Sequence, residues 1–242
     1  MGVPGTAQVR EIDESGVRRL GLGAGLGFAG AVAAIVLPLT FLFVAANYRG
    51  GFFTFSSRFV EVTSILVIAG AILLFLSLFV YRRSFAAFRK ADPRFYAASI
   101  LCLLGSLGFL LLLVAATIVA GNTGSLLTCV HGQPSHALSC LESGQPFGAL
   151  TSLLGFALGW LGGLGIMIGL LLAGRRVHAG ALMGSGVVYG LLLLLLLLPL
   201  LALFVTLPGA AYLVILAPLL AVVGPALALQ GSLGALRRLA RT

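Results

Sequence analysis

Long apolar runs separated by short polar segments dominate the pattern along this chain. Six such runs occupy residues 20–46, 62–81, 95–120, 147–173, 181–205 and 210–230. Each run is near or above the length of about 20 residues that a helix needs to cross the hydrocarbon core of a bilayer. The pattern therefore predicts an all-α, polytopic membrane protein, with six transmembrane helices forming one domain over residues 20–230.

Local signals predict where several of these helices begin, extend and bend. Asp92 and Pro93 have the arrangement of an N-cap followed by proline at the first helical position, which starts the third span close by. Residues 84–90 continue the second span as a basic juxtamembrane helix. Pro199 removes a backbone donor and predicts a kink in the fifth span, while the sixth span contains Pro218 and Pro225.

The composition changes the picture by excluding a soluble domain. Hydrophobic residues make up 60% of the chain and charged residues only 9%, and the mean hydropathy is +1.15. Soluble proteins are about 45–50% apolar and about 25% charged. The net charge of +9 does not indicate nucleic acid, because the basic residues form short groups beside the apolar runs, as they do where membrane topology is set. We expect a lipid bilayer as the main partner, no nucleic acid, and a location in the cell membrane.

The distribution of these basic groups predicts the orientation. If both termini are cytoplasmic, every Lys and Arg except Arg49 and Arg58 lies on the cytoplasmic side, which is the side where such residues accumulate. Residues 1–19 then form a short cytoplasmic segment, residues 231–242 a basic cytoplasmic tail, and residues 121–146 an outer loop. The basic pairs beside the spans determine this topology: Arg18, Arg19, Arg82, Arg83, Arg175, Arg176, Arg237 and Arg238.

The predicted outer loop contains two cysteines, Cys129 and Cys140, separated by ten residues. An oxidising compartment favours a disulfide between them, which would stabilise the fold by about 2–3 kcal/mol through loop closure. The alternative is a metal site that adds His131 and His136 as ligands. Their spacing is not a standard zinc pattern, so we predict the disulfide and no metal. Cys102 lies within the third span and is expected to be a small packing residue.

Glycines at four-residue spacing occur in the first and fourth spans. Small residues at this spacing allow membrane helices to approach one another closely. The glycine-rich run at residues 21–27 lacks the spacing of a dinucleotide-binding loop, and no strand precedes it. We therefore predict helix packing through Gly21, Gly25, Gly155, Gly159, Gly163, Gly165 and Gly169.

The spans contain no ionisable residue of the kind that marks proton or ion pathways in membranes. Ser185 and His178 come nearest to a nucleophile and a base, but both lie near the cytoplasmic edge. We predict no enzymatic activity and no cofactor. The leading hypothesis is a structural or interaction subunit of a membrane assembly, with other membrane proteins or a second copy as partners.

Two other functions stay open at this point. One is a small-solute transporter or channel with a path near the proline-broken fifth and sixth helices. This function requires a continuous polar cavity near the midplane, and a tightly packed core would exclude it. The other is an accessory subunit of a membrane enzyme that acts through the basic segment at residues 82–94.

The order of three features resembles an uncharacterised family of archaeal integral membrane proteins of unknown function. These features are the two-cysteine outer loop, the glycine-rich fourth span ending in Gly174-Arg175-Arg176, and the sequence Arg82-Arg83-Ser84-Phe85-Ala86-Ala87-Phe88 after the second span. The resemblance covers most of the chain from Leu20 onward. It implies a similar arrangement of spans and an archaeal origin, and it assigns no activity and no functional residue.

Overall fold

The computed structural model describes residues 6–37, 57–121, 146–202 and 210–240, and these are helical apart from short turns. The elements are α1 (Thr6–Ala31), its continuation as the π-helix η1 (Val32–Val36), α3 (Ser57–Phe88), α4 (Phe95–Gly121), α7 (Pro146–Arg176), α8 (Gly180–Ala202) and α9 (Ala210–Leu239). These residues contain no strand, so the predicted all-α fold class is confirmed for them.

Five helices contain a stretch that is long and apolar enough to cross a membrane. The helix α8 contributes a shorter apolar stretch, Gly180–Leu196. The chain is therefore a multi-pass helical membrane protein. The five stretches are Glu11–Val36, Ile68–Phe88, Phe95–Val114, Leu153–Arg176 and Leu216–Leu239.

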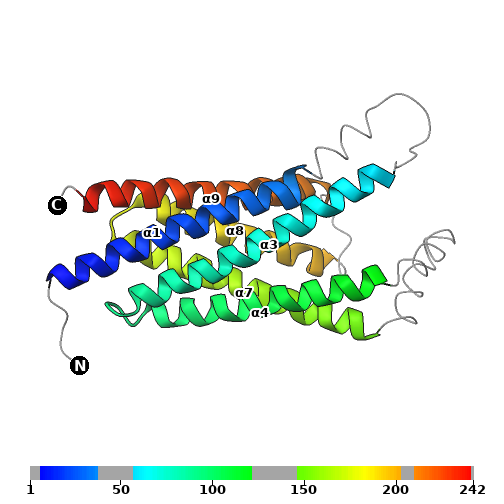
Figure 1. Cartoon of the computed structure of the whole chain (residues 1–242), viewed down its shortest axis with the longest axis horizontal. Coiled ribbons are helices and arrows are strands. Elements are labelled where there is room, and N and C mark those ends of the chain that lie inside the picture. Colours follow the sequence, from blue (N-terminus) through cyan, green and yellow to red (C-terminus); the bar gives the residue numbers. More distant parts are fainter. Residues whose placement is uncertain (1–5, 38–56, 122–145, 203–209, 241–242) are drawn as a thin grey trace.

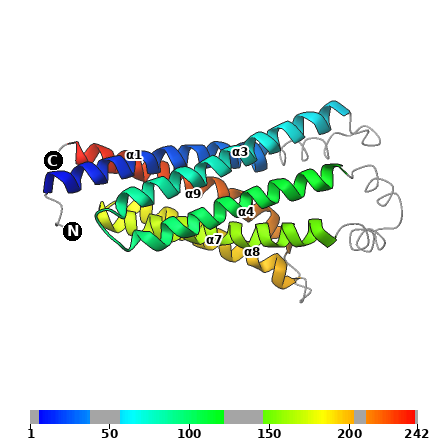
Figure 2. The same cartoon turned by 60° about the horizontal axis from the view of Figure 1, so that its bottom comes forward.

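The six long helices form a closed ring. Each helix packs against the next one along the chain, and α9 returns to pack against α1. Figure 2 shows α1, α3 and α9 on one side of this ring and α4, α7 and α8 on the other. The start of α1, the end of α9 and the α3–α4 and α7–α8 turns lie at one end, which we call the basic end (Figure 1). The opposite end is called the far end.

Two helices extend further at the basic end than their apolar runs predict. The helix α1 begins at Thr6, and α9 continues to Leu239. Their terminal turns are amphipathic, because Val17 and Ala235 are buried while neighbouring arginines are exposed. Packing of the buried face therefore continues the helix beyond the apolar run. The exposed arginines are Arg18, Arg19, Arg237 and Arg238.

Two tight turns connect the helices at the basic end. In the first, the Arg94 amide donates to Asp92 Oδ1 at 2.9 Å, and α4 begins at Phe95. In the second, His178 adopts a left-handed conformation with φ 51°. Nη1 of Arg238 donates to the His178 carbonyl at 2.8 Å, so α9 holds the α7–α8 turn in place.

The predicted outer-loop site lies outside the described residues. Cys129, Cys140, His131 and His136 all belong to that part of the chain, and the disulfide stays a prediction.

Cys102 is a buried free thiol whose Sγ lies 4.0 Å from the Gly162 carbonyl oxygen.

Candidate functional site

Small residues at seven-residue spacing join α1 to α3. The Ser84 hydroxyl donates to the Gly16 carbonyl, and the Ser77 hydroxyl donates to the Gly23 carbonyl, each at 2.7 Å. Gly30 follows seven residues later and meets the backbone of α3. These positions run antiparallel along the two helices, so one repeating contact fixes their register. The sequence analysis predicted contacts through glycines four residues apart, and it missed this seven-residue repeat.

The closest approach in the ring is between α4 and α7. Gly105 and Gly162 face each other backbone to backbone, and a methyl group added to either would overlap the other. Gly155 and Gly165 also face α4, and Gly108 of α4 lies against the backbone of α7. Only glycine allows two helix backbones to come this near.

The remaining glycines of the predicted packing set face in different directions. Gly25 and Gly159 have open space where a side chain would project. The others meet three different helices: Gly21 faces the Ser232 hydroxyl of α9, Gly163 faces Leu193 of α8, and Gly169 faces the Phe85 ring of α3.

Aromatic side chains fill the interior of the basic half. Tyr81, Phe85, Phe88 and Phe95 are all fully buried. Phe85 stacks against Tyr81 with 6.0 Å between ring centroids, and Phe95 stacks against Phe85 at 6.2 Å and against Phe88 at 5.0 Å. The Phe88 ring also fits against Gly16, where no side chain competes for the space. This aromatic cluster closes the ring at the basic end.

An apolar cavity lies beside the aromatic cluster, on its far-end side. Its volume is about 440 Å³, within the range of about 300–1,000 Å³ that is typical of small-molecule sites. No charged side chain is among the described residues that line it. All six helices contribute to the wall, through residues such as Ala31, Leu74, Phe109, Phe156, Leu192 and Ala221.

Two polar side chains in this wall already have backbone partners. The Ser77 hydroxyl donates to the Gly23 carbonyl, and Trp160 Nε1 donates to the Leu193 carbonyl at 3.1 Å. Because these donors are satisfied, they add little polarity to the cavity. Pro225 in α9 has no N–H that could donate to the Ala221 carbonyl four residues earlier. This carbonyl therefore lacks its usual helical donor and adds some polarity to the wall.

The polar groups without such partners lie between the cavity and the aromatic cluster. The Tyr81 hydroxyl is buried and has no hydrogen-bond partner among the residues that the structure describes. The side chains of Tyr189 and Cys102 lie near it. Tyr189 also lines the cavity. Two phenol groups with unused hydrogen-bonding capacity therefore stand at the inner end of an apolar space.

The cavity is partly open, and its lining is almost entirely apolar. Water in such a space would find few hydrogen-bond partners. Hydrocarbon is therefore the occupant that this lining suits best.

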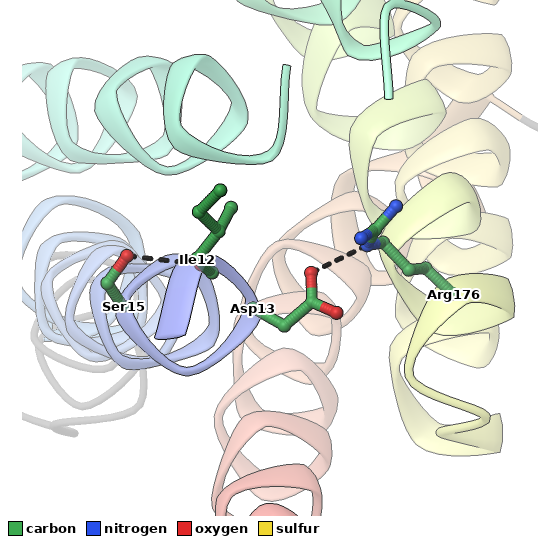
Figure 3. Close-up of polar contacts among 4 residues, drawn as sticks. All are labelled: Ile12, Asp13, Ser15 and Arg176. Atoms are coloured by element: carbon green, nitrogen blue, oxygen red, sulfur yellow. Dashed lines mark hydrogen bonds and ion pairs between the residues drawn. The ribbon is translucent and has the colours of Figure 1, made fainter. Parts of the chain in front are cut away.

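The predicted topology residues lie together at the basic end, and one of them forms an ion pair. Nε of Arg176 in α7 lies 2.6 Å from Oδ1 of Asp13 in α1 (Figure 3). These helices are not neighbours in the ring, so the pair bridges between them. Arg175, by contrast, is exposed.

The sequence indicated part of this site. Pro218 and Pro225 were expected near a ligand path, and both line the cavity. The contributions of the other four helices were not anticipated. The one available signal was the position of Trp160 and Tyr189 in the middle of their spans, away from the interfacial belt that such residues usually occupy.

Comparison with known proteins finds no family model, no curated protein and no solved structure that matches this chain. The resemblance to an archaeal membrane protein family stays a prediction.

Proposed function

We propose that this protein is a non-enzymatic membrane protein that binds an apolar, lipid-like molecule inside its helix ring. The observation that carries the proposal is the cavity of about 440 Å³ to which all six helices contribute. Its lining suits hydrocarbon, and its volume suits a single chain-like molecule. The scarcity of hydrogen-bonding groups in the wall also favours hydrocarbon over water as the occupant.

The same geometry favours binding over conduction of polar solutes. A channel for such solutes needs polar groups through both halves of the bundle. The described interior of the basic half is instead filled by the aromatic cluster, which leaves no space for a continuous path. The predicted role as an interaction subunit fits a binding protein that presents its ligand to another membrane protein or to a second copy.

Tyr81 and Tyr189 add a polar requirement to the ligand. Tyr189 lines the cavity, and its hydroxyl can donate a hydrogen bond to a ligand there. A hydroxyl or carbonyl oxygen at the end of an apolar chain would accept that hydrogen bond. The proposed ligand is therefore a hydrocarbon chain with one oxygen-bearing end, oriented towards the aromatic cluster.

The proposed arrangement in the membrane has six crossings with both termini in the cytoplasm. The charge distribution supports it, because Arg58 is the only Lys or Arg of the described residues outside the basic half. With this orientation the aromatic cluster faces the cytoplasm, and the cavity lies towards the outer leaflet of the cell membrane.

Native mass spectrometry after mild detergent extraction tests the proposal. We expect the wild-type protein to retain an apolar adduct that organic extraction removes. Gly159→Leu adds a side chain at a residue that lines the cavity, and nothing lies within 4 Å of the added Cβ. This variant should lose the adduct.

Gly25→Leu is the matched control, since its Cβ also meets open space and Gly25 does not line the cavity. It should retain the adduct. A wild-type protein without an adduct, or equal retention in both variants, would contradict the proposal.

Tyr189→Phe tests the polar end of the ligand. One hydrogen bond contributes about 1 kcal/mol, so affinity for a long-chain alcohol should fall about fivefold. Affinity for the alkane of the same length should stay unchanged. Equal losses for both ligands would show that Tyr189 contributes only packing.

A further inference from the structure

A second cavity lies on the outer surface of the bundle, between α1 and α3 at the basic end. Its volume is about 520 Å³. The lining residues recur on one face of each helix, so the cavity is a groove that follows the two helices. The α1 side is formed by Ile12, Ser15, Arg19 and Leu22. The other side is formed by Val80, Arg83, Ala86 and Ala87 of α3 and by Lys90 in the turn after α3.

Three cations surround this groove. Arg19, Arg83 and Lys90 are all exposed, and no ion pair with them is present among the described residues. The Arg83 guanidinium lies over the Phe79 ring at 4.7 Å from the centroid. This contact directs Arg83 along α3 and away from the end of the helix. The three charges are therefore available to a ligand.

No acidic residue is among the described residues that line the groove. Asp13 is paired with Arg176 on a different side of α1, as Figure 3 shows, while Ser15 lies on the groove side. Glu11 and Glu14 of α1 are exposed and do not line the groove. The Ser15 hydroxyl donates to the Ile12 carbonyl at 3.1 Å, and its oxygen keeps capacity to accept a hydrogen bond. The groove therefore holds a net positive charge.

The floor of the groove is apolar. Leu22 and Val80 line its side nearest the far end, and Ala86 and Ala87 continue the apolar surface towards the basic end. Both helices contain candidate membrane spans that pass through this region. A cationic rim above an apolar floor, placed where two spans leave the membrane, matches the headgroup and upper chain of a lipid.

We propose that this groove binds the headgroup of an anionic phospholipid. The phosphate lies among Arg19, Arg83 and Lys90, and an acyl chain follows Leu22 and Val80 into the bilayer. This site is separate from the cavity inside the ring, and it does not depend on the function proposed for that cavity. An anionic lipid bound here would hold α1 and α3 together at the membrane surface.

The test titrates the full-length protein in detergent with phosphatidylglycerol and with phosphatidylcholine, and counts bound lipids by native mass spectrometry. Each cation in contact with the bound headgroup contributes about fivefold to the binding of an anionic lipid. The variant with Arg19→Gln, Arg83→Gln and Lys90→Gln should therefore bind phosphatidylglycerol about a hundredfold more weakly. Its affinity for phosphatidylcholine should change much less.

The control replaces three exposed arginines of the same end that do not line the groove, with Arg94→Gln, Arg175→Gln and Arg237→Gln. It removes the same charge and should change the affinity less than about twofold. Equal losses in the control would overturn the proposal, since they would show attraction to net charge alone.

Two further arms keep the result decisive. A variant with Arg19→Lys, Arg83→Lys and Lys90→Arg preserves the charge and should retain phosphatidylglycerol, which separates loss of charge from loss of folding. Glycerol phosphate in solution should not displace the lipid, because it cannot use the apolar floor. Displacement by glycerol phosphate, or no preference for phosphatidylglycerol over phosphatidylcholine in the wild type, would refute the lipid site.

Discussion

The two halves of the helix ring are built from similar residues and have opposite interiors. In the basic half, four aromatic rings fill the centre and none is exposed. In the far half, the same six helices surround a cavity of about 440 Å³. Leucine, glycine and alanine dominate the helices in both halves, so overall composition does not determine which half is packed.

The difference follows from the direction in which glycines face. In the basic half, Gly16 and Gly169 face the rings of Phe88 and Phe85, and each absent side chain leaves room for a ring. In the far half, Gly159 faces open space at the cavity, and Ala31 and Ala221 project only small side chains towards it. Glycines that face a ring let that ring fill the interior, whereas the small residues that line the cavity leave its space open.

The largest expected difference in the yield of folded protein is between two variants that place leucine at one of two nearby glycines of α7. Gly162→Leu would force a side chain into the Gly105 backbone, which cannot move aside without separating α4 from α7. We expect loss of folded protein, because overpacking against backbone exceeds the usual cost of about 1–3 kcal/mol. Gly159→Leu should fold with normal yield, because its Cβ meets open space.

Size-exclusion chromatography in detergent measures the yield of folded monodisperse protein for both variants. Normal yield for Gly162→Leu would contradict the backbone-to-backbone contact between α4 and α7.

The next effect compares one phenylalanine from each half. Phe85 is fully buried between Tyr81 and Phe95, and Phe85→Ala should destabilise the protein by about 3–5 kcal/mol. Phe109 lines the cavity, so Phe109→Ala removes fewer contacts and enlarges a space that already exists. We expect its cost to be about half as large. Unfolding followed by circular dichroism compares the two variants, and equal costs would contradict the difference between the halves.

A smaller effect concerns the serine–glycine contacts between α1 and α3. Ser84→Ala and Ser77→Ala each remove a hydroxyl that donates to a glycine carbonyl at 2.7 Å. Hydrogen bonds between membrane helices contribute about 0.6 kcal/mol on average. We expect both variants to lose about this amount in the same unfolding assay, and the double variant to lose the sum. A much larger loss for Ser77→Ala would indicate that Ser77 also orders the cavity.

The smallest expected effect is a gain in stability at the α7–α8 turn. His178 has φ 51°, which costs a non-glycine residue about 1 kcal/mol. His178→Gly removes this strain and keeps the carbonyl that accepts from Arg238. Since glycine also adds entropy to the unfolded chain, the net gain should be about 0.5 kcal/mol. A loss of stability would show that the imidazole has a contact of its own.

The sequence was sufficient for the helical class because hydrophobic period and run length are local properties. It also indicated close packing of the glycine-rich fourth span, where Gly162 and Gly165 now lie against α4. It did not reveal the contact between Gly105 and Gly162, because their partnership depends on how α4 and α7 are aligned after folding. The cavity was hidden for the same reason, since its wall combines single residues from six helices that are far apart in the chain.

The helix ends show a similar limit. The run of apolar residues predicted the end of the sixth span at residue 230, yet α9 continues to Leu239. Ala235 is buried against the ring, and this tertiary contact extends the helix through a segment that looks like a basic tail when read alone.

Fluorescence of Trp160 tests the central claim most directly. It is the single tryptophan of the chain, and it lines the cavity. We predict that a dibrominated long-chain alcohol, added to the protein in detergent, quenches this fluorescence to saturation at one molecule per chain. The quenching should be lost in Gly159→Leu and in Ala221→Phe, which fill the cavity from two different helices, and retained in Gly25→Leu. Quenching that rises without saturation, or that persists in both filled variants, would contradict the account of a ligand-binding ring.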